Sequence, residues 1–398
     1  MKLNTQIFLG LILGVVVGLV LGDAAVLFET VGEVFLRLLK MLIIPLILSS
    51  IVMGIVSLGD VHHLGKLGGR TGFYFLGTTL LSCTLGAFIA TMLKPGIGSG
   101  LTVANFSGEA LTNETMSWGT IFTQIVPSNI VGSMAQGQML PTIFFALIFG
   151  AALISIGPKG EKIIQWMDSF NEVILKLVDW VMRLAPIGVF ALMAALVGDT
   201  GLEAFVPLAL YILTVLLGLF IHGLIFLPII LIVFGGFSPF VLIRHASPAL
   251  AMAFSTSSSM ATLPITMDFL KKKVGISNRV ASFVCPLGAT INMDGTALYQ
   301  VVASIFIAQV YGIHLSMGQL AIIVVTATLA SIGAAAIPSA GLVTMAIILN
   351  AVGLPIEGIG LILAVDRILD MVRTSVNVLS DLVGSVIVAR REGESLTL

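Results

Sequence analysis

The sequence predicts an all-α membrane protein with eight transmembrane helices and two re-entrant helical hairpins. Of its 398 residues, 58% are hydrophobic and only 10% are charged, whereas roughly a quarter of the residues in a soluble domain carry charge. Apolar windows of about 18 residues or more, long enough to span hydrocarbon, lie near 5–22, 31–58, 72–93, 140–157, 163–198, 203–234, 279–311 and 355–389. Two further apolar regions, near 241–270 and 318–350, are interrupted by Ser, Gly or Pro and leave halves too short to span.

The composition also limits the kinds of partner that the protein can have. A formal net charge of -1 leaves no surplus positive field to hold nucleic acid, so the lipid bilayer is the predicted surrounding. Cys83 and Cys285 lie in apolar stretches and are interpreted as small buried hydrophobes, not as a disulfide or a metal pair. The first apolar run follows Lys2 as in a signal peptide, but the many later spans favour an uncleaved first helix.

Basic residues set the predicted orientation, because they collect on the cytoplasmic side of membrane proteins. The segment 95–158 holds no Lys or Arg, and its polar part, 95–133, is predicted as an external loop. Both termini are then cytoplasmic, and the protein lies in the plasma (inner) membrane. The basic residues on the cytoplasmic side in this topology are Lys2, Lys66, Arg70, Lys159, Lys162, Lys271, Lys272, Lys273, Arg279, Arg390 and Arg391.

The C-terminal half repeats one pattern twice, a hairpin followed by an interrupted helix. The first hairpin is predicted to open toward the cytoplasm and the second toward the outside, which is typical of an inverted repeat. In transporters with such repeats, the substrate site lies where the broken segments meet at mid-membrane. We therefore expect one polytopic domain, 1–398, with its site between the two hairpin tips.

The last span carries a polar stripe within the stretch AVDRILDMVRTSVNVLSDLVG. Five charges in sixteen residues cannot face lipid, since each costs roughly 2.5–3.5 kcal/mol at the helix centre. They face protein, water or ligand, and the alternative to a ligand site is a salt-bridge network that satisfies itself. Arg367 lies off the centre of the stripe. Its role stays open between a structural ion pair and a contribution to the electrostatics of the site. The stripe residues, spaced mostly by three or four positions, are Asp366, Asp370, Arg373, Thr374, Asn377 and Asp381.

The seventh span is interrupted at 288–296, where Asn, Asp and two glycines occur in the stretch GATINMDGT. An unwound turn frees backbone carbonyls, and carbonyl and carboxylate oxygens are the ligands of a hard cation. Asn292 and Asp294 are the natural ligands, with Asn377 and Asp381 as partners from the last span. The alternative for Asp294 is an ordinary hydrogen-bonded buried acid.

The two hairpin tips are weaker signals. The first, 255–264, is rich in hydroxyl residues that offer donors to a carboxylate, although serine-rich turns are common. The second, 331–341, combines flexible glycines with a proline and is interpreted as a gate, with a simple helix break as the alternative.

Together these four segments closely resemble the glutamate transporter family, the dicarboxylate/amino acid:cation symporters. The motifs are the serine-rich tip ending in Thr-Leu-Pro, the Asn-Met-Asp-Gly-Thr stretch, the Gly/Pro tip and Asp-x-x-Arg-Thr-x-x-Asn-x-x-x-Asp. The resemblance implies a homotrimer with an elevator-type mechanism. It places the scaffold in 1–71 and 133–200, and the mobile transport core in 72–94 and 201–391.

The resemblance also implies roles for individual residues. Arg373 would pair with the side-chain carboxylate of the substrate and Asp370 with its α-amino group, since an arginine fork suits a carboxylate. Further substrate contacts would come from Thr374, Asn377, Ser258, Ser259, Thr296, Ile337 and Gly341. The implied sodium ligands form three sets: Gly288, Asn292, Asn377 and Asp381; Thr290, Met293, Ser331, Ile332 and Ala334, chiefly through backbone oxygens; and Thr78, Thr79, Asn292 and Asp294.

Some positions depart from the family pattern. Ser257 and Met371 stand where archaeal and animal relatives, respectively, have an arginine, and Arg367 is a candidate for the displaced charge. Gln300 stands where proton- and potassium-coupled animal relatives have glutamate. Asp381 replaces the amide of some proton-coupled bacterial relatives. The last two differences favour sodium coupling without protons.

These expectations combine into a symporter, not an enzyme, that couples Na⁺ to uptake of L-aspartate or L-glutamate. The alternatives are a proton-coupled glutamate or C4-dicarboxylate symporter and a neutral amino acid:sodium symporter. Arg373 argues against a neutral substrate and Asp370 against a plain dicarboxylate. An ion channel and an intramembrane hydrolase are the alternatives from other classes. No chemistry is assigned to the histidines, which are mostly near loops or span ends: His62, His63, His222, His245 and His314.

Overall fold

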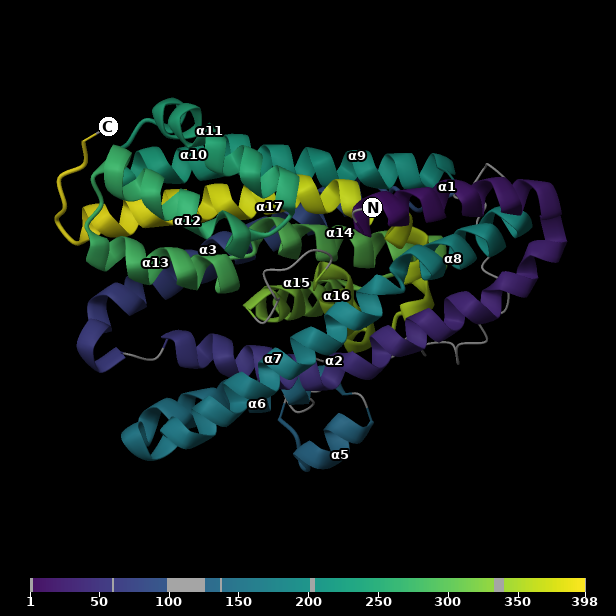
Figure 1. Cartoon of the computed structure of the whole chain (residues 1–398), viewed down its shortest axis with the longest axis horizontal. Coiled ribbons are helices and arrows are strands. Elements are labelled where there is room, and N and C mark those ends of the chain that lie inside the picture. The colour runs from purple at the N-terminus through teal and green to yellow at the C-terminus, as the bar shows by residue number, and fades with distance from the viewer. Residues whose placement is uncertain are drawn as a thin grey trace.

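In a computed structural model of the chain, the described residues are 3–58, 61–98, 126–136, 138–200, 205–332 and 340–397. Within these ranges every regular element is helical (Figure 1), as the sequence predicted. The elements of the N-terminal half are α1 (Leu3–Leu21), η1 (Gly22–Phe28), α2 (Glu29–Leu58), α3 (Val61–Leu93), α5 (Ile130–Ala135), α6 (Met139–Ser155), η2 (Gly157–Gly160), α7 (Glu161–Arg183) and α8 (Ala185–Thr200).

The described part of the C-terminal half contains three π-helical turns and ends in the 33-residue helix α17. Its elements are α9 (Phe205–Ile221), η4 (His222–Phe226), α10 (Leu227–Ile230), η5 (Leu231–Gly235), α11 (Pro239–Thr256), α12 (Ser259–Phe269), η6 (Leu270–Val274), α13 (Asn278–Ile291), α14 (Asp294–Val310), α15 (Met317–Ile332), α16 (Ala340–Ala351), η7 (Ile356–Gly358) and α17 (Ile359–Arg391).

Five helical segments of the described residues are long and apolar enough to cross a membrane: Leu9–Phe35, Leu67–Leu93, Pro207–Gly235, Asn278–Val310 and Val365–Arg391. A sixth crossing results if Gly157–Val181 and Ala185–Ala195, which meet at an angle of 50°, form one span. The remaining predicted spans, 31–58 and 140–157, contain apolar helices too short to count alone. A multi-pass membrane architecture is thus confirmed, whereas the total of eight crossings stays a prediction.

The two interrupted apolar regions each fold into a pair of helices that pack against each other. In the first, α11 and α12 are separated at Ser257, whose φ of +49° is left-handed. The next residue, Ser258, caps α12, because its side chain accepts a hydrogen bond from the Ala261 backbone N–H at 3.2 Å. In the second pair, α15 and α16 pack together, and the residues 333–339 between them lie outside the described residues.

The predicted break in the seventh span is confirmed, whereas a break in the last span is not found. The backbone leaves the helix at Asn292 and Met293, between α13 and α14. The last helix, α17, runs without interruption from Ile359 to Arg391, so that prediction was wrong. A helix unwinds where glycine or proline weakens its backbone, and the polar stripe of α17 contains neither.

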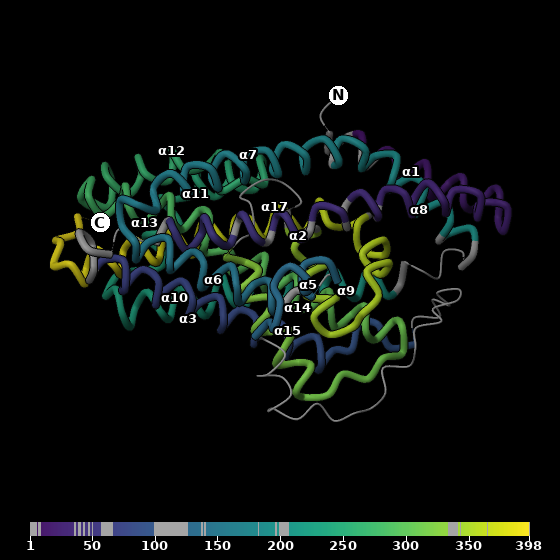
Figure 2. Tube along the Cα trace, turned by 90° about the horizontal axis from the view of Figure 1, so that it is seen from below, coloured from purple at the N-terminus to yellow at the C-terminus, as the bar shows by residue number. Residues whose placement is uncertain are grey.

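The broken span and α17 form the centre of the molecule. The best apolar window of Asn278–Val310 is 100% buried and that of Val365–Arg391 is 83% buried, against 17% for Leu9–Phe35. In Figure 1, α17 runs along the long axis between α9 and α14, and it contacts α3, α11 and α13 as well. The peripheral helices α1 and α8 lie side by side at the end away from the C-terminus (Figure 2). The polar stripe of α17 is therefore enclosed by helices.

Candidate functional site

The carboxylate of Asp294 is held at the point where the broken span meets α3 and α17. It is fully buried. The Thr79 hydroxyl donates to Oδ1 at 2.7 Å, and the Thr78 hydroxyl lies 3.3 Å from the same oxygen. The Ser380 hydroxyl of α17 donates to Oδ2 at 2.7 Å, and the Ser82 hydroxyl donates to the Asp294 carbonyl at 2.7 Å. The predicted grouping of Thr78, Thr79 and Asp294 is thus brought together.

A histidine that sequence reasoning set aside also contacts this carboxylate. His222 lies in the π-helical turn η4, in the middle of a span, and is fully buried. Its Nε2 is 3.0 Å from Asp294 Oδ2. The sequence placed the histidines mostly near loops or span ends and assigned them no chemistry; His222 is the exception in position, because it lies within a span and contacts a buried carboxylate. Its signal was the one histidine within the stretch 205–235, which holds no Asp, Glu, Lys or Arg.

A second buried carboxylate, that of Asp381, lies beside the break. The Asn292 amide donates to Asp381 Oδ1 at 2.9 Å, which joins the broken span to α17. Gly288 lets this carboxylate approach α13, because a Cβ at Gly288 would lie only 2.4 Å from Asp381 Oδ1. The Thr78 hydroxyl lies 3.4 Å from Asn292 Oδ1, so this group is continuous with that around Asp294. Two carboxylates and several neutral oxygens therefore gather within one buried region, which suits a hard cation.

The Asn377 side chain links α17 to the start of α14. Its Oδ1 accepts a hydrogen bond from the Gly295 backbone N–H at 2.7 Å. Its Nδ2 donates to Thr296 Oγ1 at 3.1 Å and lies 3.4 Å from Met293 Sδ. The structure thus brings these predicted substrate and sodium ligands together, on the broken span and not on a hairpin tip.

Arg373 is the most deeply buried large side chain of the polar stripe. Its guanidinium donates from Nη1 to Asp366 Oδ1 at 2.8 Å and from Nε to Asp370 Oδ1 at 2.9 Å. It also stacks over the Tyr299 ring, 4.2 Å from the ring centroid. A Cβ at Gly341 would lie 3.1 Å from Arg373 Nη2, so α16 begins directly above the guanidinium. Within the described part of the chain, Nη2 itself has no hydrogen-bond partner.

Arg367 completes a four-charge cluster on α17. Its Nη1 lies 3.5 Å from Asp370 Oδ2, and its side chain is 14% exposed, against 1% for Arg373. Arg367 and Arg373 balance the charges of Asp366 and Asp370. The salt-bridge network that the sequence left open is therefore present, and it surrounds the arginine that was predicted to bind a carboxylate. Within the described residues it is not fully satisfied, because Asp366 Oδ2, Arg367 Nε and Arg373 Nη2 have no hydrogen-bond partner.

The other predicted site residues make no described contact with the two carboxylates or with Arg373, or they lie outside the described residues. Thr374 is buried on α17, and Ser259 is buried at the first tip, whose described hydrogen bonds are local to the tip. The Thr290 hydroxyl bonds its own helix and the Ser331 hydroxyl donates to Thr328 O, so neither side chain joins the carboxylates. Ile332 is buried at the end of α15. Ala334 and Ile337 lie outside the described residues.

Gln300 connects α14 to the second helix pair. Its Nε2 donates to the Gly341 carbonyl at 3.1 Å and contacts the Thr344 hydroxyl. This position, predicted to differ from proton-coupled relatives, therefore holds the start of α16 next to Arg373.

Comparison with known proteins places this sequence in a family. The model of the Sodium:dicarboxylate symporter family matches residues 3–391. The chain belongs to this family. It is accordingly a multi-pass membrane transporter and not an enzyme. The sequence resemblance to the glutamate transporters is thereby confirmed.

Relatives within the family differ in what their names say they carry. A proton/sodium-glutamate symport protein of Bacillus caldotenax is 37% identical over 398 residues, covering 98% of this chain and 94% of that relative. A C4-dicarboxylate transport protein of Bacillus subtilis is 36% identical, covering 99% and 94%. A neutral amino acid transporter B(0) of Oryctolagus cuniculus is 40% identical, covering 92% and 74%. The side chains of the site must therefore decide the substrate.

Proposed function

We propose that this protein is a secondary active symporter that couples Na⁺ to the uptake of L-aspartate or L-glutamate. The observation that carries the proposal is the pair formed by Arg373 and Asp370, one turn apart on a buried face of α17 and 2.9 Å from each other. An acidic amino acid has two carboxylates and one amine, and this pair offers a fork for a carboxylate and an acceptor for the amine.

Binding would exchange internal ion pairs for pairs with the substrate. The side-chain carboxylate of the substrate takes the place of Asp366 on the Arg373 fork, and the amine takes a place on Asp370. Arg367, at 3.5 Å from Asp370, keeps that carboxylate partly neutralised during the exchange. Because the four charges already balance, a substrate of net charge -1 leaves the region negative, which favours entry together with cations.

The charged ligands of the proposed cation site are Asp294 and Asp381. Hydroxyl and amide oxygens of Thr78, Thr79 and Asn292 add neutral ligands, and the unwound turn adds carbonyls. We include Gly288, Thr290, Met293, Ser331, Ile332, Ala334 and Asn377 in this proposal chiefly as donors of neutral oxygens.

We propose the architecture of an elevator-type transporter, in which a mobile core moves against a fixed scaffold. Eight spans and two re-entrant hairpins, 241–270 and 318–350, form one chain with both termini in the cytoplasm of a homotrimer. The scaffold comprises 1–71 and 133–200, and the moving core comprises 72–94 and 201–391. Ser258, Ser259, Thr296, Thr374, Ile337 and Gly341 complete the substrate cradle, with the second hairpin as gate.

The test is uptake of labelled L-aspartate and L-glutamate into proteoliposomes under an inward gradient of sodium, of protons, or of neither. The proposal expects saturable uptake that needs the sodium gradient alone. Uptake driven by protons alone would retain the substrate class and reject sodium as the coupling ion. Transport of succinate in preference to aspartate would reject the role of Asp370, and ion current without substrate would indicate a channel.

A further inference from the structure

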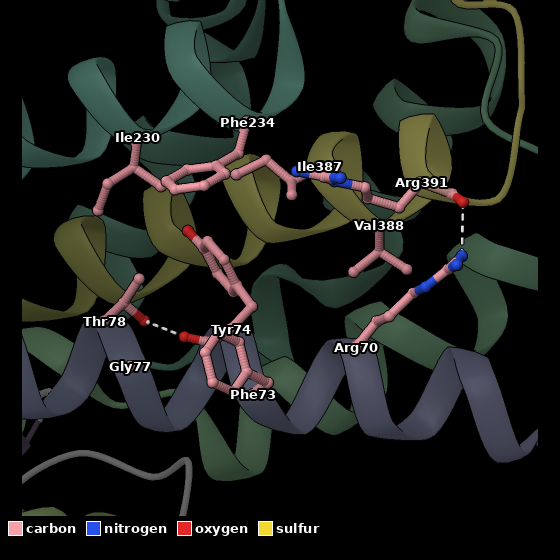
Figure 3. Close-up of a pocket in the computed structure, with 10 residues that line it drawn as sticks. All are labelled: Arg70, Phe73, Tyr74, Gly77, Thr78, Ile230, Phe234, Ile387, Val388 and Arg391. Atoms are coloured by element: carbon pink, nitrogen blue, oxygen red, sulfur yellow. Dashed lines mark hydrogen bonds between the residues drawn. The ribbon is translucent and has the colours of Figure 1, made fainter.

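A cavity lies at the end of the molecule where α3 begins and α17 ends (Figure 3). Its volume is about 410 Å³, within the range of roughly 300–1,000 Å³ that small-molecule sites occupy. It lies between α3, the π-helical end of the span Pro207–Gly235, and the last turns of α17. Its lining residues are Arg70, Phe73, Tyr74, Gly77, Thr78, Ile230, Phe234, Ile387, Val388 and Arg391.

The interior of this cavity is apolar and open to the surface of the helices. Phe73 is 82% exposed and Phe234 is 52% exposed, so the aromatic walls face the surrounding lipid. The Thr78 hydroxyl is directed to its own helix, donating to Tyr74 O at 3.1 Å, as the dashed line in Figure 3 marks. Gly77 faces this open space, since a Cβ there would meet no atom within 4 Å.

Two arginines mark one edge of the cavity. Arg70 Nη1 donates to the Arg391 carbonyl at 2.5 Å and to Glu392 at 2.7 Å, which fixes the start of α3 to the end of α17. The Arg391 side chain is exposed and runs back toward Ile387 in Figure 3. Within the described residues it makes no ion pair, so its charge is available to a ligand. An apolar slot with cationic groups at one end fits a molecule with a hydrocarbon chain and an anionic head.

We infer that this cavity binds an anionic phospholipid, with an acyl chain against Phe73, Gly77 and Phe234 and the headgroup on Arg391 and Arg70. Charge complementarity selects an anionic over a zwitterionic lipid. The position also fits, because this end carries the basic residues that predict a cytoplasmic face, and anionic lipids enrich that leaflet. The inference goes beyond the proposed transport function and does not depend on which substrate is carried.

The inner wall of the cavity is shared with the buried carboxylates. Tyr74 donates its hydroxyl to the Ser380 carbonyl at 3.2 Å, and the Ser380 side chain bonds Asp294. Thr78, on the same wall, lies 3.3 Å from Asp294 Oδ1. An acyl chain packed on Tyr74 and Thr78 therefore stabilises the contact of α3 with α17, and lipid binding raises the thermal stability of the protein.

The test is native mass spectrometry of the detergent-purified full-length protein, titrated with phosphatidylglycerol or with phosphatidylcholine of the same chains. Gly77→Leu fills the cavity with a side chain. Its matched control is Gly69→Leu on the same helix, where a Cβ also meets no atom within 4 Å but the cavity is not touched. Arg391→Gln removes the positive charge that would bind the headgroup. Its control is Arg390→Gln at the exposed neighbour, which does not line the cavity.

The expected result is preferential binding of phosphatidylglycerol by wild type and both controls, loss of that preference in Gly77→Leu, and a roughly fivefold weaker affinity in Arg391→Gln. This fold-change corresponds to about 1 kcal/mol per arginine near an anionic surface. Equal binding of the two lipids by wild type would overturn the inference. Retention of the preference for phosphatidylglycerol by both Gly77→Leu and Arg391→Gln would also overturn it. If Gly77→Leu does not fold, the comparison of Arg391→Gln with Arg390→Gln decides. Because binding is measured without transport, failure here leaves the proposed function untouched.

Discussion

The substitution Arg373→Gln tests the proposed substrate site most directly, but the ion pairs of Arg373 mean that the single variant cannot be interpreted by itself. Arg373 is almost fully buried and pairs with Asp366 at 2.8 Å and Asp370 at 2.9 Å. Removing one partner of a buried ion pair costs about 3–5 kcal/mol, because the remaining charge is left without compensation. Loss of uptake in the single variant would therefore also follow from poor folding.

The double variant Arg373→Gln with Asp366→Asn separates the two causes. It removes one charge of each sign from neighbouring positions, and Asp370 retains Arg367 as a partner at 3.5 Å. We expect a folded protein with thermal stability close to that of wild type. The variant loses two charge-assisted hydrogen bonds to the substrate carboxylate, each worth about 1.5–3 kcal/mol. Affinity for L-aspartate should then fall roughly 10²–10⁴-fold.

The assay is uptake of L-aspartate by proteoliposomes under a sodium gradient, with KM and maximal rate measured separately. Neutral amino acids such as L-serine should gain uptake in the double variant, because they leave no buried charge unpaired. Asp366→Asn alone is the control, and it should lower the KM for aspartate, since the internal competitor for Arg373 is removed. A folded double variant with an unchanged KM for aspartate would refute the assignment of Arg373.

Substitutions at four further positions test the remaining contacts. Gly288→Ala would place a methyl group about 2.4 Å from Asp381 Oδ1. We therefore expect half-saturation to require roughly tenfold more sodium, which corresponds to about 1.4 kcal/mol. Unchanged sodium dependence would contradict the proposed role of Asp381 as a cation ligand. Asp381→Asn should likewise weaken the sodium dependence of aspartate uptake, measured as initial rate against sodium concentration. His222→Leu leaves a buried carboxylate without one hydrogen bond and should lower the free energy of unfolding by about 1–3 kcal/mol. His222→Asn keeps a hydrogen-bond donor and should lose much less. Equal losses in the two variants would indicate that His222 contributes through packing alone. Glu392→Gln breaks pairs with Arg70 at 2.7 Å and Arg279 at 3.3 Å, but these pairs are partly exposed, so the loss of stability should not exceed about 1 kcal/mol.

The sequence was most informative where a polar residue contradicts its apolar surroundings. Asn, Asp and two glycines in the stretch 288–296 predicted the break at Asn292 and Met293, because glycine weakens a helix and polar side chains compete for its backbone. The spacing of the α17 polar residues predicted one buried face, and Asp366, Asp370, Arg373 and the others are all buried.

Elsewhere the sequence lacked the information that contacts supply. The break predicted in α17 was wrong because its polar side chains bond each other and α14, which leaves the backbone of the helix intact. His222 was missed because its partner Asp294 lies 72 residues away. The cation–π contact of Arg373 with Tyr299 joins two different helices and has no local pattern. The cavity beside α3 is lined by residues from three segments that are far apart in the sequence, so no local pattern predicts it.

The geometry also suggests why cation and substrate are coupled in one protein. The unwound turn is held on one side by Asn292 against Asp381, and on the other by Gly295, whose N–H is bound by Asn377. A Cβ at Gly295 would lie 2.5 Å from the Arg373 carbonyl, so the start of α14 rests on the backbone of Arg373, the proposed substrate ligand. A cation that fixes the turn therefore fixes the register between α14 and α17, and with it the position of the Arg373 guanidinium. Since binding free energies are reciprocal, a substrate that orders Arg373 strengthens cation binding by the same factor.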